Sequence, residues 1–171
     1  MTDIQSGRWA ANIDGDFVVF LIGAKAHKPW KVHKWLPVGR AMRRMIAELK
    51  QAPDMGLLHV ERFGGGNGGV LVQYWRSFEH LHAYARNTDA EHLPAWAWFH
   101  KKVGMVGDVG IWHETYQVRA GQYEAIYGDM RPMGLGVAGT LIPATGAAKT
   151  ARGRKGETQG EDYPEGILEE A

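Results

Sequence analysis

Hydrophobic residues run without a break through DFVVFLIG, residues 16–23, and the run stops at a glycine. β-branched and aromatic residues dominate it, and its length suits a strand. Successive side chains of a strand point to opposite faces of a sheet, so this strand is apolar on both faces. One face carries Phe17, Val19 and Leu21, and the other carries Val18, Phe20 and Ile22.

The spacing of apolar residues changes after a lysine-rich loop. Between Val38 and Leu49 they recur every three to four residues, while charged residues occupy the other angles. Pro37 stands just before this pattern, and proline is well suited to the first position of a helix. The sequence therefore predicts a helix from Pro37 to about Leu49.

Two further hydrophobic stretches, residues 56–63 and 70–77, flank the segment GGGNGG, residues 64–69. A glycine-rich turn between two such stretches predicts an antiparallel hairpin. The segment lacks the Lys-Ser/Thr pair of a phosphate-binding loop and precedes a strand instead of a helix. We therefore interpret it as a hairpin turn.

A second helical region follows the hairpin. Ser77 is a suitable N-cap for a helix that begins at Phe78, and a further helical segment spans residues 89–103. Residues 107–118, GDVGIWHETYQV, predict a fourth strand. The order β-α-β-β-α-β is that of the α+β ferredoxin-like fold, with one four-stranded antiparallel sheet.

Such a sheet carries helices on one face only. The first strand is apolar on both faces, so the second face also needs cover. A second sheet from an identical subunit is the simplest cover, and we therefore expect a homodimer with sheets packed face to face, a dimeric α/β barrel.

The composition changes near residue 144. Residues 144–171 are rich in glycine, alanine and charge, with few residues able to enter a core. We expect a single domain over residues 1–143, followed by a tail that is either flexible or docked onto the partner subunit.

The overall composition excludes some classes of function for this protein. The 171 residues are 44% hydrophobic and 23% charged, as in an ordinary globular protein. A formal net charge of +1 gives no reason to expect nucleic acid or a membrane as partner. No cysteine is present, which excludes disulfides and thiolate chemistry. Without an apolar leader or membrane-spanning stretch, a cytoplasmic protein is expected.

Seven tryptophans and eight histidines are the unusual part of the composition. On the fourth strand His113 shares a face with Ile111, whereas Trp112 and Tyr116 share the opposite face. A buried polar side chain without a partner costs a few kcal/mol, so these side chains either pair or line a cavity. His92 and His100 lie on the helical segment 89–103, whose aromatic stripe is more typical of a core than of a cofactor site.

Four long segments resemble a small monooxygenase-like family typified by a fungal enzyme of fumagillin biosynthesis. They lie within residues 8–139 and read DGDFVVFLIGAKAHKPWKVHKW, VQYWRSFEHLHAYAR, HLPAWAWFHKKVG and VGIWHETYQVRAGQYEAIYGDMRPMGL. The resemblance implies a dimeric α/β barrel, similar to antibiotic-biosynthesis monooxygenases and to small haem-handling proteins. His100 stands where the family often has asparagine.

The resemblance and the residues together give a first hypothesis, a monooxygenase acting on a small hydrophobic or aromatic substrate. His113 is the candidate base, since imidazole titrates near neutral pH. Trp112 or Trp75 would shape the pocket, and Tyr116 or His92 would donate hydrogen bonds. No flavin fingerprint and no metal-ligand spacing is found, so no cofactor is expected.

Two alternatives stay open. In one the pocket holds haem, with His92 or His100 as the axial ligand on the helix before the last strand. In the other the protein binds a hydrophobic metabolite without turning it over.

Overall fold

The computed structural model describes residues 4–104 and 106–159. The chain divides into two compact units. The larger comprises Val18–Gln117, and the smaller comprises the described residues up to Phe17 and from Val118 onward. None of the helices within the described residues is long and apolar enough to span a membrane.

The larger unit has a ferredoxin-like α+β fold, which confirms the predicted element order. Its sheet has the strand order β3-β4-β2-β5, and β4 pairs antiparallel with both β2 and β3. In chain order the elements are β2 (Phe17–Ala26), α1 (Val32–Gln51), the 3-10 turn η1 (Pro53–Met55), β3 (Leu57–Gly65), β4 (Gly68–Trp75), α2 (Phe78–Arg86), α3 (His92–Lys102) and β5 (Val109–Val118).

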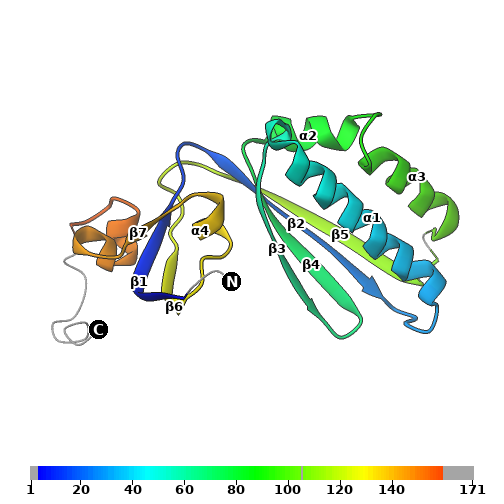
Figure 1. The fold of residues 1–171 in the computed structure, drawn as a ribbon, viewed down its shortest axis with the longest axis horizontal. Helices are drawn as coiled ribbons and strands as arrows, with labels where there is room; N and C mark the ends of the chain where they lie inside the picture. The colour runs from blue at the N-terminus through cyan, green and yellow to red at the C-terminus, as the bar shows by residue number, and fades with distance from the viewer. Residues whose placement is uncertain (1–3, 105, 160–171) are drawn as a thin grey trace. The chain divides into compact units, whose positions relative to one another are not determined.

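All three helices cover the same face of this sheet (Figure 1). Val18 of β2 and Trp75 of β4, which face each other in register, are buried in one cluster with Met45 and Leu49 of α1. The side chains that alternate with them point to the opposite face, which no described helix or strand of this unit covers (Figure 1). We call that surface the uncovered face.

Helix α1 begins earlier than the sequence predicted. It starts at Val32, so Pro37 lies inside the helix and not at its first position. A proline there removes one backbone hydrogen bond. Two side-chain bonds hold the added first turn: the Trp35 indole donates to the Pro29 carbonyl at 2.8 Å, and Lys34 Nζ donates to the Lys102 carbonyl at 2.5 Å.

The hairpin and the helix cap agree with the sequence patterns. Strands β3 and β4 pair as far as Gly65 and Gly68, so the connecting turn is shorter than the glycine-rich segment. Ser77 is the N-cap of α2, and its hydroxyl accepts the backbone N–H of His80. The cap satisfies one of the free N–H groups of the first helical turn.

Asp108 ties the β2–α1 connection to the start of β5. Its carboxylate lies 2.8 Å from Lys28 Nζ and 2.9 Å from Lys31 Nζ, and its carbonyl accepts the backbone N–H groups of His27 and Lys28. The hydrogen bonds from the two lysines hold the pKa of Asp108 at about 2. The carboxylate therefore stays ionised at any ordinary pH.

The smaller unit contains a three-stranded antiparallel sheet that the sequence analysis did not predict. Its strand order is β6-β1-β7. Tyr123 braces the segment before β2: its ring packs edge-on against Phe17 at 5.0 Å, and its hydroxyl accepts the backbone N–H of Ile13. The elements are β1 (Gln5–Asn12), β6 (Ile126–Met130), α4 (Leu135–Ala138), β7 (Thr140–Pro143), the 3-10 turn η2 (Gly146–Lys149) and α5 (Ala151–Arg154).

The described part of the predicted tail, residues 144–159, belongs to this smaller unit. Thr150 is buried, and Arg154 pairs with Glu124 at 2.6 Å. Residues 160–171 lie outside the described residues. The single domain over residues 1–143 and the docking of the tail onto a partner stay predictions.

Candidate active site

Strand β5 divides the predicted site residues between the two faces of the sheet. Ile111 packs against a buried cluster that includes Phe99 of α3, so Ile111 and His113 belong to the helix-covered face. Trp112 and Tyr116 belong to the uncovered face. Within one subunit, the candidate base therefore does not share a pocket with these two aromatic residues.

His113 is an exposed imidazole at the border of the helix-covered face. Its ring centroid lies 5.5 Å from that of Phe20 on β2, and β5 is the edge strand of the sheet. No hydrogen-bond partner of its imidazole is found in the described part of the chain. Both ring nitrogens are therefore available to a bound molecule, and Phe20 supplies an apolar contact beside them.

The uncovered face combines aliphatic side chains with two polar pairs. Tyr116 donates its hydroxyl to Glu114 Oε2 at 2.5 Å, and this bond to a carboxylate raises the pKa of Tyr116. His59 Nε2 lies 2.9 Å from Glu61 Oε1 on β3. The aliphatic residues of this face are Val19, Leu21, Val70 and Val72.

The Trp112 indole lies next to a glycine on the uncovered face. A Cβ atom at Gly23 of β2 would come within 2.4 Å of the Trp112 indole nitrogen, so only glycine leaves room for the ring. The indole is nevertheless 45% exposed and offers an aromatic surface on this face.

Trp75 is part of the core. It is 1% exposed, its ring packs 6.0 Å from Tyr84, and its indole N–H donates to Gln73 Oε1 at 2.8 Å. Such a side chain has no surface left for a substrate, so we leave Trp75 out of the proposed site.

The two histidines of α3 lie in different surroundings. The Nδ1 atom of His92 lies 2.9 Å from the Ala85 carbonyl, and its ring lies 6.2 Å from Tyr84. A carbonyl accepts only from a protonated nitrogen, so this contact places the His92 proton on Nδ1. His100 is exposed and packs edge-on against Trp96 at 4.4 Å.

Glu48 of α1 fixes the start of α3. Its carboxylate accepts the Tyr84 hydroxyl at 2.8 Å and the backbone N–H of Glu91 at 3.2 Å. Burial, followed by the bond to Glu48, raises the pKa of Tyr84 well above its ordinary value. Tyr84 therefore stays neutral and acts as a donor that links α2 to α1.

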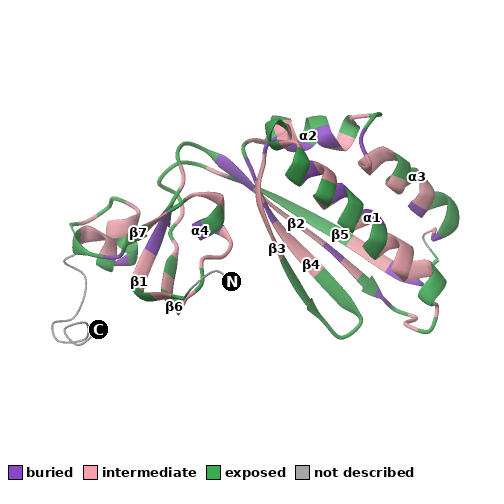
Figure 2. Ribbon diagram, in the orientation of Figure 1, coloured by how far each residue is buried: buried purple, intermediate pink, exposed green. Residues whose placement is uncertain are grey.

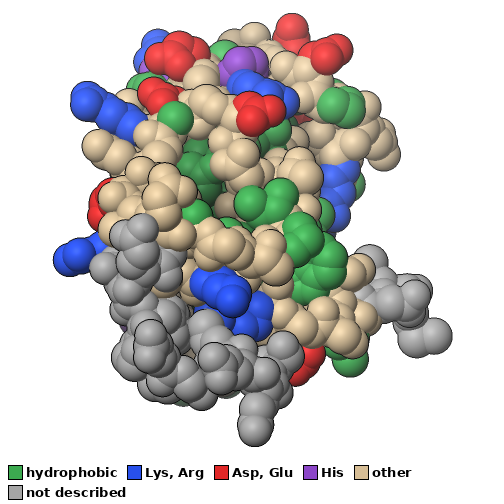
Figure 3. Space-filling model, turned by 90° about the vertical axis from the view of Figure 1, so that its left-hand side faces the viewer, with side chains coloured by type: hydrophobic (Ala, Val, Ile, Leu, Met, Phe, Trp, Pro, Cys, Tyr) green, Lys and Arg blue, Asp and Glu red, His purple; other side chains and the backbone are tan. Residues whose placement is uncertain are grey.

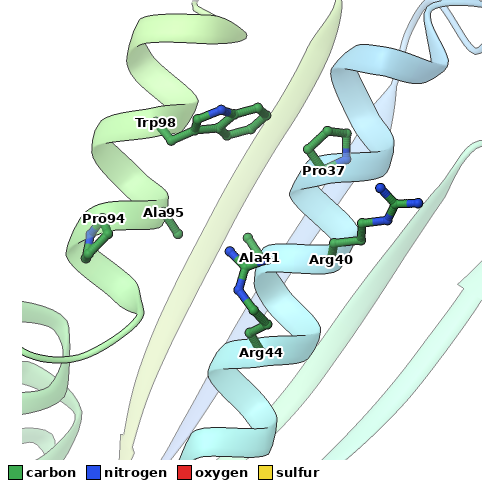
Figure 4. A pocket seen from close by; sticks show the side chains of 7 residues that line it. All are labelled: Pro37, Arg40, Ala41, Arg44, Pro94, Ala95 and Trp98. Carbon is green, nitrogen blue, oxygen red and sulfur yellow. The ribbon is translucent and has the colours of Figure 1, made fainter.

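A groove of about 440 Å³ lies between α1 and α3 (Figure 4). Small and apolar side chains line it, together with two arginines. Arg44 is paired with Glu91 at 3.0 Å, and the indole of Trp98 lies across from Pro37. The lining residues are Pro37, Arg40, Ala41, Arg44, Pro94, Ala95 and Trp98.

The sequence analysis did not single out this groove. The signal in the sequence is helical spacing after a proline on both helices: Arg40 and Ala41 stand three and four residues after Pro37, and Trp98 stands four residues after Pro94. That signal acquires meaning only when α1 and α3 are known to lie side by side.

The residues present do not favour a bound haem or metal ion. Neither His92 nor His100 lines the groove between α1 and α3. Among the residues that the structure describes, no group of three or more histidine, aspartate or glutamate side chains is placed to hold a metal ion. The reaction proposed below therefore involves neither haem nor a metal ion.

Comparison with known proteins identifies relatives for the whole of the larger unit and part of the smaller one. Residues 17–135 match the family described as Monooxygenase af470-like. Monooxygenase af470 of Aspergillus fumigatus is 27% identical over 156 residues, which cover 80% of this chain and 55% of that protein. The chain thus spans about half the length of this curated relative.

Solved structures resemble the chain in fold only. SnoaB, described as a cofactor-independent oxygenase from Streptomyces nogalater, is 15% identical, with 61% of this chain and 94% of that chain covered and a TM-score of 0.44. A protein from Bacteroides fragilis described as dimeric and ferredoxin-like is 16% identical, with 59% and 95% covered and a TM-score of 0.42. Likeness at this level does not bear on activity or assembly.

Proposed function

We propose that this chain, which belongs to the Monooxygenase af470-like family, is a monooxygenase-like enzyme that oxidises a small hydrophobic or aromatic substrate without a flavin or a metal. Family membership supports the reaction class. The observation that carries the assignment to a site is His113, an accessible imidazole beside Phe20 at the border of the helix-covered face.

The chemistry assigned to His113 is proton abstraction. A phenol or enol held against Phe20 would lose a proton to an imidazole nitrogen, and the resulting anion is electron-rich enough to reduce dioxygen. In the overall balance a CH₂ group and O₂ give a carbonyl group and water. The substrate supplies all the electrons, so the protein needs to supply only a base, a dry surface and orientation.

Trp112 and Tyr116 have a different place in this proposal. Their face is not the one that carries His113, so they do not act on the same bound molecule within one subunit. We assign them to the interior of a homodimer, where the uncovered faces of two sheets would pack together as a barrel. The half-buried aliphatic residues and the exposed Trp112 and Tyr116 of that face support this assembly.

The reaction is tested by oxygen uptake with a panel of phenols and polycyclic enols, using the full chain with a chelator and no added flavin. We expect uptake of one O₂ per substrate and a product that carries one labelled oxygen from ¹⁸O₂. Uptake that requires added flavin or metal, or no uptake across the panel, would contradict the proposal. An absorption band near that of haem in the purified protein would favour the haem alternative.

Light scattering tests the homodimer separately. We expect a mass of about twice 19.0 kDa for the full chain. Val72→Lys should shift it toward the monomer, because Val72 lies on the uncovered face opposite Leu21. Ala47→Lys is the matched control, since Ala47 is exposed on α1. A monomeric native chain, or a Val72→Lys variant that stays dimeric, would refute packing through this face.

A further inference from the structure

Two connections that are far apart in sequence meet at one end of the larger unit (Figure 1). The β2–α1 connection donates two backbone N–H groups to the Asp108 carbonyl, and Lys34 bonds to the Lys102 carbonyl at the end of α3. We call residues 25–34, 100–104 and 106–108 the basic tip. The ion pairs of Asp108 hold its two halves together.

The basic tip concentrates positive charge. It contains six lysines and one acidic residue, Asp108, although the whole chain has a formal net charge of only +1. Asp108 is 3% exposed and already paired, so the outer surface of the tip presents cations. By contrast, charges of both signs are interspersed on the face shown in Figure 3. The lysines are Lys25, Lys28, Lys31, Lys34, Lys101 and Lys102.

Hydrophobic side chains project among these lysines. Trp30 is 72% exposed, Val106 is 66% exposed and Val32 is 45% exposed. Figure 2 shows exposed residues at this end of the larger unit. Exposing apolar side chains to water is unfavourable in free energy. A partner that offers both hydrocarbon and negative charge would bury these side chains and also neutralise the lysines.

We propose that the basic tip docks the protein on the surface of an anionic lipid membrane. The tryptophan ring prefers the boundary between headgroups and acyl chains, and lysines are attracted by anionic headgroups. The two valines favour lipid over a single-stranded nucleic acid, because an aliphatic side chain offers a base no stacking surface. The docking is peripheral: the tip lies on loops and helix ends tied by Asp108.

The test is co-sedimentation of the full chain with vesicles of phosphatidylcholine alone or mixed with phosphatidylglycerol. We expect binding to the mixed vesicles that weakens with salt. Trp30→Ala should lower the partition coefficient about tenfold, because it removes the largest inserted side chain. Lys25→Gln with Lys101→Gln should lower it about 25-fold, at roughly fivefold for each lysine near the surface. Neither lysine pairs with Asp108, so the tip keeps its ion pairs.

The matched control is Arg43→Gln with Lys50→Gln, two exposed cations of α1 outside the tip. This variant should bind as the native chain does. Equal binding to both kinds of vesicle, equal losses in control and tip variants, or no sedimentation at all would each overturn the proposal. The proposal would also be overturned if the chain bound a single-stranded oligonucleotide in a way that depends on Trp30 and did not bind vesicles.

Discussion

Replacing Trp75 with alanine is expected to lower the free energy of unfolding by about 3 to 5 kcal/mol, the range for large aromatic residues in a core. The side chain is 1% exposed and lies in the cluster that joins the sheet to α1 and α2. Its loss also leaves the Gln73 amide, 4% exposed, without the indole N–H that it accepts. Chemical denaturation of the full chain measures the change.

Trp96→Ala is the control for this prediction. Trp96 is 42% exposed on α3, so the same chemical change should cost less than about 1 kcal/mol. Similar losses for both variants, or a loss below about 1 kcal/mol for Trp75→Ala, would mean that Trp75 is not the anchor of the core.

Replacing His113 with leucine is expected to lower the turnover rate of the proposed oxidation about 100-fold, the lower range for loss of a general base. The free energy of unfolding of this variant should differ from that of the native chain by less than about 0.5 kcal/mol, because the His113 imidazole is exposed and has no hydrogen-bond partner within the described residues. Initial rates of oxygen uptake at saturating substrate, together with denaturation curves, separate the two effects.

His82→Leu provides the comparison, since His82 is an exposed histidine on α2 that stacks on Phe78. It should keep full activity. A His113→Leu enzyme that turns over at the native rate would remove His113 from the mechanism, whereas equal losses in both variants would point to a general effect of histidine removal.

The fold of the larger unit could be predicted because its signals are local. The uninterrupted apolar run of β2, the glycine-rich hairpin turn and the cap at Ser77 each depend on neighbouring residues only. The sheet of the smaller unit carries no such signal. Strand β1 reads QSGRWAAN and pairs with β6 and β7, more than a hundred residues away. Short strands of mixed polarity acquire meaning only from such distant partners.

The candidate site was predictable only in part for a related reason. Alternation along β5 separates His113 from Trp112 and Tyr116, and that rule needs no structure. Which set faces the helices depends on the burial of Val18, Trp75 and Ile111 against them. The position of Trp75 in the core, and not at a pocket, depends on the same packing.

The net charge of the chain also does not reveal where charges gather on its surface. The value of +1 led to the expectation that no membrane partner exists. Folding nevertheless brings Lys28, Lys31 and Lys34 next to the end of α3, because Asp108 and the Lys102 carbonyl bind them there. A sum over the chain does not contain that information.

The glycine beneath Trp112 has a consequence for redesign of this protein. Since the indole occupies the volume where a side chain at position 23 would stand, the sizes of residues 23 and 112 are coupled. A larger residue at position 23 alone would push the Trp112 ring into the space between the two sheets of the proposed barrel. A smaller residue at position 112 alone would leave a cavity in that surface. A library that randomises one of these two positions while the other is fixed therefore contains mostly variants with a steric clash or a cavity. Variants that place a large residue at position 23 and a small one at position 112 keep the packing of the surface.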